Sequence, residues 1–454
     1  MQDHDLFPEF SKVSAQQWKQ QIQYDLKGAD YNDTLVWESP EGIKVKPFYT
    51  IEDLPSHPMP SQKADWKIGH HIKVQGMDAT RTMAQGLVAQ GVESLVLEFP
   101  ERTDMAMLLR ELAPKVPIHC KFGFLPGEDI NTLLEVARDT DGPLYLNLDL
   151  LGQLTRTGNW FTNQALDHEQ LEAMAQKVGN GPLAGLLGVD MTHYQNAGAH
   201  TVQQLAYGLA HAHEYLAHFS ERVPEVLALP MVFHVAVGPH YFFEIAKLRA
   251  LRLLWKNLCA AYDLETPCHI VAQPSLRNKT LYDFNMNMLR TTSECMAAVL
   301  GGADTICNSP YDTLFNAPND FGDRIAKNQL LLLRHEAHLV AGQDPVQGTY
   351  YLESLVQQQA KKAWELFQQL EQGGGFLAQL KKGNIQRKIR ESAQREQQLF
   401  DAQETILVGT NKYPNTEEKA QGSFGKKRRV KTLLEPIVKK RLAATTEQKR
   451  LENE

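Results

Sequence analysis

Short apolar runs followed by helical stretches repeat along the middle of the chain, and this alternation constrains the fold more than any other feature. The apolar runs are Trp66–Val74, Ser94–Phe99, Ile118–Phe122, Leu144–Leu150, Leu186–Met191, Met231–Val237, Cys268–Gln273 and Asp304–Asn308. Amphipathic segments such as Ala79–Val92, Met105–Leu112 and Asp129–Arg138 lie between them. Strands that alternate with helices form parallel βαβ units, and eight such units close into a barrel. The sequence therefore predicts an α/β protein with a (β/α)8 barrel, the TIM-barrel architecture.

Two extensions flank the predicted barrel, which occupies residues 61–340. Residues 1–60 contain a helical piece, Ser14–Leu26, and a Pro- and Gly-containing stretch, Ser39–Leu54. We expect them to form an extended arm that wraps the barrel or a partner.

Residues 341–454 are predicted to form a helical extension with a basic tail. The first helix, Ser354–Gln372, stops at a run of three glycines, and a second follows over Phe376–Ala402. The tail is rich in cations, namely Lys426, Lys427, Arg428, Arg429, Lys439, Lys440 and Arg441. Because charge runs are usually solvated, we expect a solvated or partner-binding tail.

Composition excludes several classes of function. The 454 residues include 47 Lys and Arg against 54 Asp and Glu, a net charge of −7 that gives no reason to expect nucleic acid as a partner. The chain has no apolar run of about 18 residues and no signal-peptide core, so no membrane association is expected and a cytoplasmic location is predicted. Five scattered cysteines without C-x-x-C spacing favour a reducing compartment and argue against a zinc site.

The fourth predicted strand places polar side chains on the barrel axis. Its leucines should face the helices, and Tyr145, Asn147 and Asp149 should face the axis. Neighbouring strands offer Glu98, His119, Lys121, His234 and either His70 or His71. Two interpretations remain open: Glu98, Lys121 and Asp149 pair within a filled interior, or the axis accepts a polar ligand.

Motifs in the expected order carry a family resemblance over nearly the whole chain. They are Leu6–Phe10, Asp25–Tyr31, Pro40–Ile43 with Val45–Tyr49, His193–Ala199, Phe242–Ala250, Gln273–Ser275, Leu289–Thr292, Asp320–Asn328, and Asp344–Pro345 with Gly348–Glu353. These segments closely resemble the methylmalonyl-CoA mutase family, whose entry arm reads T-P-E-G-I-x-V-K-P-L-Y-T and whose fifth loop reads H-M-Q-E-A-G-A.

The chain departs from the family's catalytic pattern on several strands. The family's R-P-W-T-I-R-Q-Y-A-G-F segment is replaced by Ala64–Ile72. In this segment Gly69 stands in place of an Arg, and His71 stands in place of the Tyr. Leu144–Leu150 replaces a Q-N-D segment, and His269–Ser275 has lost an Arg and a Ser of R-x-H-S-Q-T-S. No D-x-H-x-x-G motif of a cobalamin-binding domain occurs.

The resemblance with these departures implies a small, non-catalytic subunit of an adenosylcobalamin-dependent methylmalonyl-CoA mutase, inactive alone. It implies a heterodimer with a large catalytic subunit that holds adenosylcobalamin and interconverts methylmalonyl-CoA and succinyl-CoA, while this chain alone binds no cofactor.

His193 is the candidate for a vestigial catalytic residue, because in catalytic subunits the matching His approaches the thioester carbonyl. The residues expected to face substrate or cofactor are His193, Gln195, Gln273, Ser275 and His71, and no residue is assigned to a metal. The competing interpretation is that His193 and Gln195 serve hydrogen bonding in their loop, with Gly198 needed for the turn.

Two other functions stay open. The chain could be the barrel of a split acyl-CoA mutase whose cobalamin-binding subunit is a separate polypeptide. It could instead bind CoA esters without chemistry, using the polar axis and in particular Lys121 and Asp149.

Overall fold

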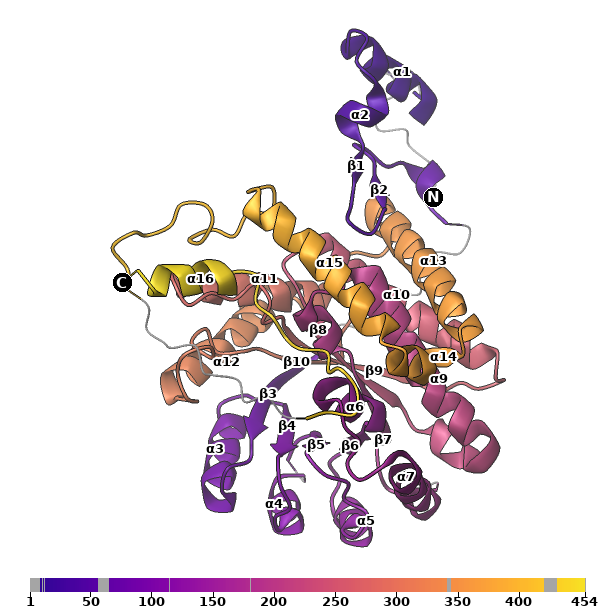
Figure 1. Cartoon of the computed structure of the whole chain (residues 1–454), viewed down its shortest axis with the longest axis vertical. Helices are drawn as coiled ribbons and strands as arrows, with labels where there is room; N and C mark the ends of the chain where they lie inside the picture. Colours follow the sequence, from indigo (N-terminus) through magenta and orange to yellow (C-terminus); the bar gives the residue numbers. More distant parts are fainter. Residues whose placement is uncertain are drawn as a thin grey trace.

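The computed structural model describes residues 9, 11, 13–55, 65–113, 115–179, 181–340, 344–419 and 431–453. Eight parallel strands form a closed barrel in which β10 pairs with both β3 and β9 (Figure 1). The strands are β3 (Lys67–Lys73), β4 (Ser94–Phe99), β5 (Ile118–Phe122), β6 (Leu144–Leu148), β7 (Gly185–Asp190), β8 (Met231–Val237), β9 (Cys268–Pro274) and β10 (Thr305–Cys307). The predicted (β/α)8 barrel is confirmed, and each strand lies within or next to its predicted apolar run.

Helices surround the barrel because each has one apolar face to bury. In α5 (Ile130–Asp139), the apolar side chains Ile130, Leu133, Leu134 and Ala137 recur at helical spacing and are buried. The other helices of this layer are α3 (Met77–Ala89), α4 (Met105–Leu112), α6 (Leu150–Thr157), α7 (Gln164–Val178), α8 (Thr192–Ala197), α9 (Thr201–Arg222), η2 (Pro224–Ala228), α10 (Tyr241–Ala260), α11 (Met286–Leu300) and α12 (Asp320–His335). Within the described residues, none of the helices is long and apolar enough to cross a membrane.

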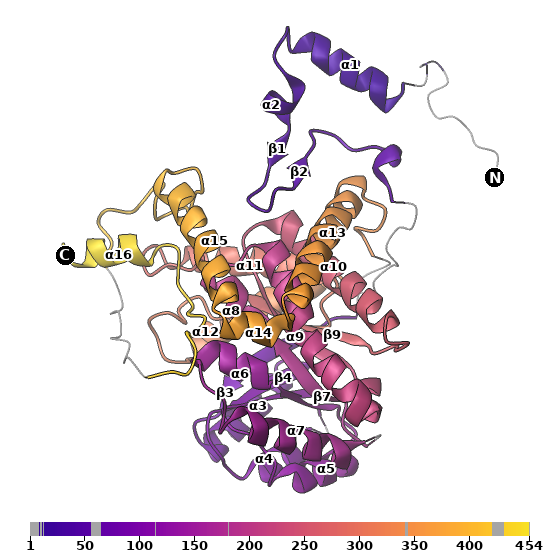
Figure 2. The same cartoon turned by 45° about the vertical axis from the view of Figure 1, so that its right-hand side comes forward.

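The N-terminal arm, residues 13–55, packs on the barrel unit around its hairpin, where Ile43 is fully buried, while its helices extend away from the barrel (Figure 2). It contains α1 (Ala15–Asp25), α2 (Tyr31–Leu35), an antiparallel hairpin of β1 (Trp37–Glu38) and β2 (Lys44–Val45), and η1 (Ile51–Asp53). Figures 1 and 2 both show α1 and α2 projecting beyond the hairpin, with the barrel on the other side. A capping box between Ser14 and Gln17 starts α1, as the Ser-x-x-Gln spacing favours.

The C-terminal extension begins with α13 (Tyr350–Gln372), which packs on α9 and α10. The single helix expected over Phe376–Ala402 is wrong: α14 (Gly375–Lys381) and α15 (Asn384–Asp401) are separate helices. Gly383 lies between them with φ of +72°, a left-handed conformation that ends a helix.

Residues 431–443, here named the C-terminal strap, run against the barrel and lead into α16 (Ala444–Leu451) (Figure 1). The backbone of the strap bonds to barrel loops, so this part of the expected basic tail packs on the chain itself. Residues 6–8, the expected domain limits at 60/61 and 340/341, and the cations Lys426–Arg429 lie wholly or partly outside the described residues.

Candidate functional site at the barrel mouth

Side chains fill the barrel axis. The rings of His119 and Tyr145 stack with centroids 4.3 Å apart, and His269 lies 5.0 Å from both. An apolar cluster of Val96, Val232, Val271 and Cys307 packs in the same interior. The interior is therefore filled, as one of the two interpretations expects, but Glu98, Lys121 and Asp149 do not pair with one another.

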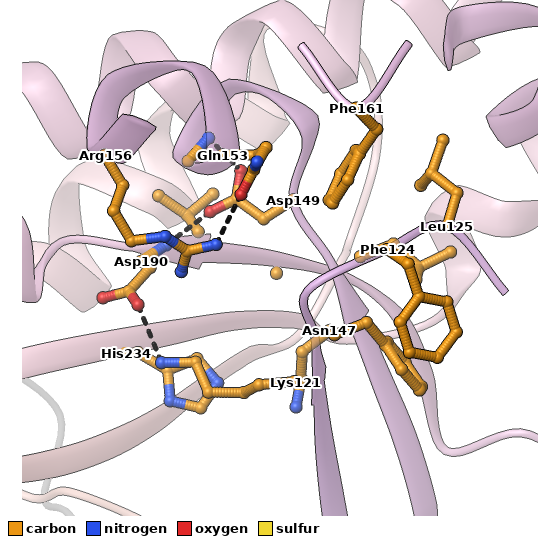
Figure 3. Close-up of a pocket in the computed structure, with 15 residues that line it drawn as sticks. Lys121, Phe124, Leu125, Asn147, Asp149, Gln153, Arg156, Phe161, Asp190 and His234 are labelled. Atoms are coloured by element: carbon orange, nitrogen blue, oxygen red, sulfur yellow. Dashed lines mark hydrogen bonds and ion pairs between the residues drawn. The ribbon is translucent and has the colours of Figure 1, made fainter. Parts of the chain in front are cut away.

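Charged groups pair at the C-terminal ends of the strands. The Lys121 ammonium lies 2.7 Å from Asp190 Oδ2, and His71 Nε2 lies 3.3 Å from Glu98 Oε2. Figure 3 shows Lys121 of β5, Asp190 of β7 and His234 of β8 converging at the mouth. Of the two adjacent histidines, His71 faces Glu98, whereas His70 is buried on the other face of β3 against Asp323.

These pairs shift the pKa values of both carboxyl groups. The hydrogen bond from His71 holds the pKa of Glu98 at about 2, even though partial burial acts in the opposite direction. Burial would raise the pKa of Asp190, but Lys121 and the neighbouring histidines together hold that pKa well below its usual range. Both carboxylates are therefore charged at neutral pH.

Asp149 does not belong to the axis, and the prediction that it pairs there is wrong. Asn147 adopts φ of +46° and the pairing register shifts between Tyr145 and Leu148, so the strict alternation ends. Asp149 caps α6 instead, accepting a hydrogen bond from the Tyr215 hydroxyl and contacting His211 Nε2, both at 2.8 Å. Burial opposes the charge of this carboxylate, but His211 and the hydrogen bonds give it a lowered pKa.

His193 lies in α8 at the edge of the mouth and is buried. Its Nε2 lies 3.5 Å from Asp190 Oδ2, and within the described residues neither ring nitrogen makes a hydrogen bond. Burial lowers the pKa of His193 to about 4, and the cations Lys439, Arg156 and Lys121 act in the same direction while Asp190 opposes them. The imidazole is therefore neutral at pH 7.

The other expected site residues do not gather around His193. Gln195 accepts a hydrogen bond from Gln204 and lines a separate groove of about 730 Å³ beside the hairpin, α13 and α15. The Ser275 hydroxyl donates to Asn196 Oδ1 at 3.0 Å, which ties two loops together. Gln273 follows Val271 at strand spacing in β9 and so shares its inward face.

Sequence reasoning missed Asp190 and the strap residue Lys439. Asp190 follows Gly188 by two positions in the fifth apolar run, so strand alternation places both residues on the same face. It also precedes His193 by three positions, and these two spacings were the available signal. Lys439 was recognised only as part of a basic tail, because nothing local in the sequence places it near the mouth.

The space at the mouth is too small for a coenzyme. The cavity lined by Lys121, Asn147, Asp149, Asp190 and His234 measures about 30 Å³, room for about one or two water molecules. Ligand sites usually measure about 300 Å³ or more. An acyl-CoA therefore does not fit this cavity, and no group of three His, Cys, Asp or Glu among the described residues could hold a metal.

The fold and the site define a class: a (β/α)8 barrel whose axis is filled and whose mouth is closed by ion pairs. The profile of the family described as Methylmalonyl-CoA mutase matches residues 148–450. The chain belongs to the methylmalonyl-CoA mutase family.

Similar proteins include both kinds of subunit. A methylmalonyl-CoA mutase small subunit of Porphyromonas gingivalis is 29% identical over 460 residues, covering 91% of this chain and 72% of the relative. A methylmalonyl-CoA mutase of Rhizobium meliloti is 36% identical over 84% of this chain and 61% of its own length. A large subunit from Porphyromonas gingivalis is 32% identical, over 52% of this chain and 34% of its own length.

Proposed function

We propose that this chain is the small, non-catalytic subunit of a methylmalonyl-CoA mutase. The observation that carries the proposal is the closed mouth, where Lys121 pairs with Asp190 and a cavity of about 30 Å³ leaves no room for an acyl-CoA. The Tyr and Arg that the family resemblance expects on the first strand are replaced by Gly69 and His71, and His71 pairs with Glu98. The described groups at the mouth pair with one another, which supports a structural role for this part of the barrel.

Adenosylcobalamin belongs to the large partner subunit in this proposal. The cofactor supplies the radical that starts the isomerisation of methylmalonyl-CoA to succinyl-CoA, and no step of that reaction is assigned to residues of this chain. The free thiols of all five cysteines support a reducing, cytoplasmic compartment.

The N-terminal arm is the proposed docking element for the large subunit. No residue of α1 is buried, and Trp18 and Tyr24 are 50% and 80% exposed. At the base of the arm, Trp37 stacks on His240 with ring centroids 5.5 Å apart. Exposed aromatic side chains are common anchors of protein interfaces, and a permanent heterodimer should bury about 2,000 Å² or more.

Co-expression with a large methylmalonyl-CoA mutase subunit tests the proposal. Light scattering should give a heterodimer, and mutase activity with adenosylcobalamin should follow the large chain and be absent from this chain alone. Turnover of methylmalonyl-CoA by this chain alone would overturn the proposal. A homodimer of this chain that does not bind the co-expressed large chain would favour the split-mutase or CoA-ester-binding alternatives.

Calorimetry then separates those alternatives. Saturable binding of propionyl-CoA that is lost in Lys121→Ala would indicate a CoA-ester binding protein. Its absence, together with activity after addition of a separate cobalamin-binding subunit, would indicate a split mutase.

A further inference from the structure

The C-terminal strap crosses the face of the barrel on which the mouth opens. Four of its backbone amides donate to carbonyl groups in the segments that follow β6, β7 and β9. The bonds run from Leu434 to Gly158 at 2.9 Å, from Ile437 to Thr155 at 2.8 Å, from Lys440 to Asn196 at 2.9 Å and from Leu442 to Arg277 at 2.8 Å. In a parallel barrel these segments lie around the mouth, so the strap runs along part of its rim, past α6 and on to α16 (Figure 1).

Side chains of the barrel and of α15 donate hydrogen bonds to carbonyl groups of the strap. The Arg277 guanidinium donates to the carbonyl of Lys440 at 2.7 Å, and Gln386 of α15 donates to the carbonyl of Glu435 at 3.1 Å. Ile437 and Leu442 are buried apolar contacts of the strap, with 4% and 3% of their surface exposed. The strap therefore has specific partners along its length.

The packing around Gly158 shows how closely the strap lies on the end of α6. This glycine has φ of +75°, and a Cβ added there would lie 2.3 Å from the carbonyl oxygen of Leu434 and 2.9 Å from Thr432 Cβ. Both distances are shorter than any real Cβ contact, so only glycine permits the observed packing.

The strap also brings a positive charge to the mouth. Lys439 lies between the residues bonded to Thr155 and Asn196, and its charge acts on Asp190, Lys121 and Arg156. Burial lowers the pKa of Lys439, and the charge of Asp190 opposes that shift.

Limited apolar burial favours local opening of the strap. Its side chains Ile437, Leu442 and Ala443 are buried, but Leu433 and Val438 are 66% and 53% exposed, in contrast to β8, whose residues are all buried. Segments with few buried apolar contacts open at a lower free energy than the core does.

We propose that residues 431–443 form an intramolecular lid over the ends of α6 and α8, including the buried His193 of α8, and that this lid opens while the barrel stays folded. The closed lid limits the access of solutes to His193 in the isolated chain. This inference goes beyond the proposed function, since it needs neither the large subunit nor the mutase reaction.

The test compares Gly158→Ala with Gly383→Ala. Both glycines have positive φ, at +75° and +72°, so the backbone strain of alanine is similar, but a Cβ at Gly383 has nothing within 4 Å. Only Gly158→Ala should push the strap away. Hydrogen exchange followed by mass spectrometry reports strap opening, and diethyl pyrocarbonate, which modifies neutral imidazole, reports access to His193.

In Gly158→Ala we expect at least tenfold faster amide exchange over residues 431–443 and modification of His193, with β8 protected as in the wild type. Gly383→Ala should match the wild type in both readouts. Three results would overturn the lid: equal effects of the two variants, faster strap exchange with His193 still unmodified, or loss of strap protection only together with β8. If Gly158→Ala does not fold, Ile437→Ala against Val438→Ala repeats the comparison with the same outcomes.

Discussion

The two ends of this chain leave the barrel in different ways. The N-terminal arm contains a capped helix, α1, with no buried residue, and it projects away from the barrel. The C-terminal strap has no regular secondary structure, yet its backbone bonds to three loops and its helix α16 carries the buried Glu447. Regular local structure and attachment to the fold are thus separate properties.

The difference teaches which extension belongs to the folded unit. A helix such as α1 satisfies its backbone internally and needs no neighbour, although its exposed aromatic side chains remain available to a partner. The strap satisfies its backbone only by pairing with the barrel. Stability should therefore depend on the strap, and association on the arm.

Glu447→Ala should have the largest effect. The Glu447 carboxylate is buried, accepts the amide of Leu281 at 2.7 Å and lies 2.5 Å from Arg441. Removing one partner of a buried charge pair costs about 4 kcal/mol of unfolding free energy. Urea denaturation measures the loss, and Glu452→Ala, on the exposed face of α16, should change stability by less than about 0.5 kcal/mol. Equal losses in both variants would contradict a buried anchor.

His193→Asn should change how stability depends on pH. The folded-state pKa of His193 is about 4, below the ordinary 6.5, so between these values the unfolded chain binds a proton that the folded chain does not. The free energy of unfolding therefore falls as pH falls from about 6.5 to 4, by about 3 kcal/mol at most from this residue. His193→Asn should lose this part of the slope in urea unfolding at a series of pH values.

The arm supplies the control for this slope. Residues 13–55 contain no histidine, so Trp18→Ala should keep the wild-type dependence on pH. An unchanged slope in His193→Asn would show that other buried groups, such as His119 and His234, account for it.

Periodicity made most of the fold predictable. The runs Ser94–Phe99, Ile118–Phe122 and Met231–Val237 match β4, β5 and β8 at both ends, because the face of each strand that packs on the helices is apolar and buried. The break between α14 and α15 escaped the prediction, since a single glycine at 383 ends a helix only when its φ is positive.

The site was less predictable, because it depends on long-range contacts. Strand alternation placed Lys121, Glu98 and His234 correctly on the axis, but it failed at Asp149, where one left-handed residue, Asn147, redirects the chain. The strap could not be located from sequence at all. Its partners in the barrel are more than a hundred residues away, and the composition of a basic segment does not indicate which loop its backbone will bond.

Ile437→Ala should have a smaller effect than loss of Glu447. This side chain is 4% exposed, and truncating a buried isoleucine costs about 2 kcal/mol or more. Its neighbour Val438 is 53% exposed, so Val438→Ala should change the unfolding free energy by less than about 0.5 kcal/mol. Thermal and urea unfolding measure both variants. An unchanged free energy of unfolding in both of them would contradict packing of the strap on the barrel.

Trp18→Ala should leave the isolated chain unchanged and weaken its association. Trp18 is 50% exposed and its ring lies 6.5 Å from Phe48 within the arm, so the loss of unfolding free energy should be under about 0.5 kcal/mol. If the arm docks the large subunit, removing an aromatic anchor should raise the Kd of the heterodimer about tenfold, or about 1.4 kcal/mol. Ile437→Ala serves as the opposite control in the same titration, because it should lower stability and leave the Kd near the wild-type value. A Kd unchanged by Trp18→Ala would show that α1 is not the docking surface. A lower free energy of unfolding in Trp18→Ala would show that α1 contributes to the stability of the folded unit.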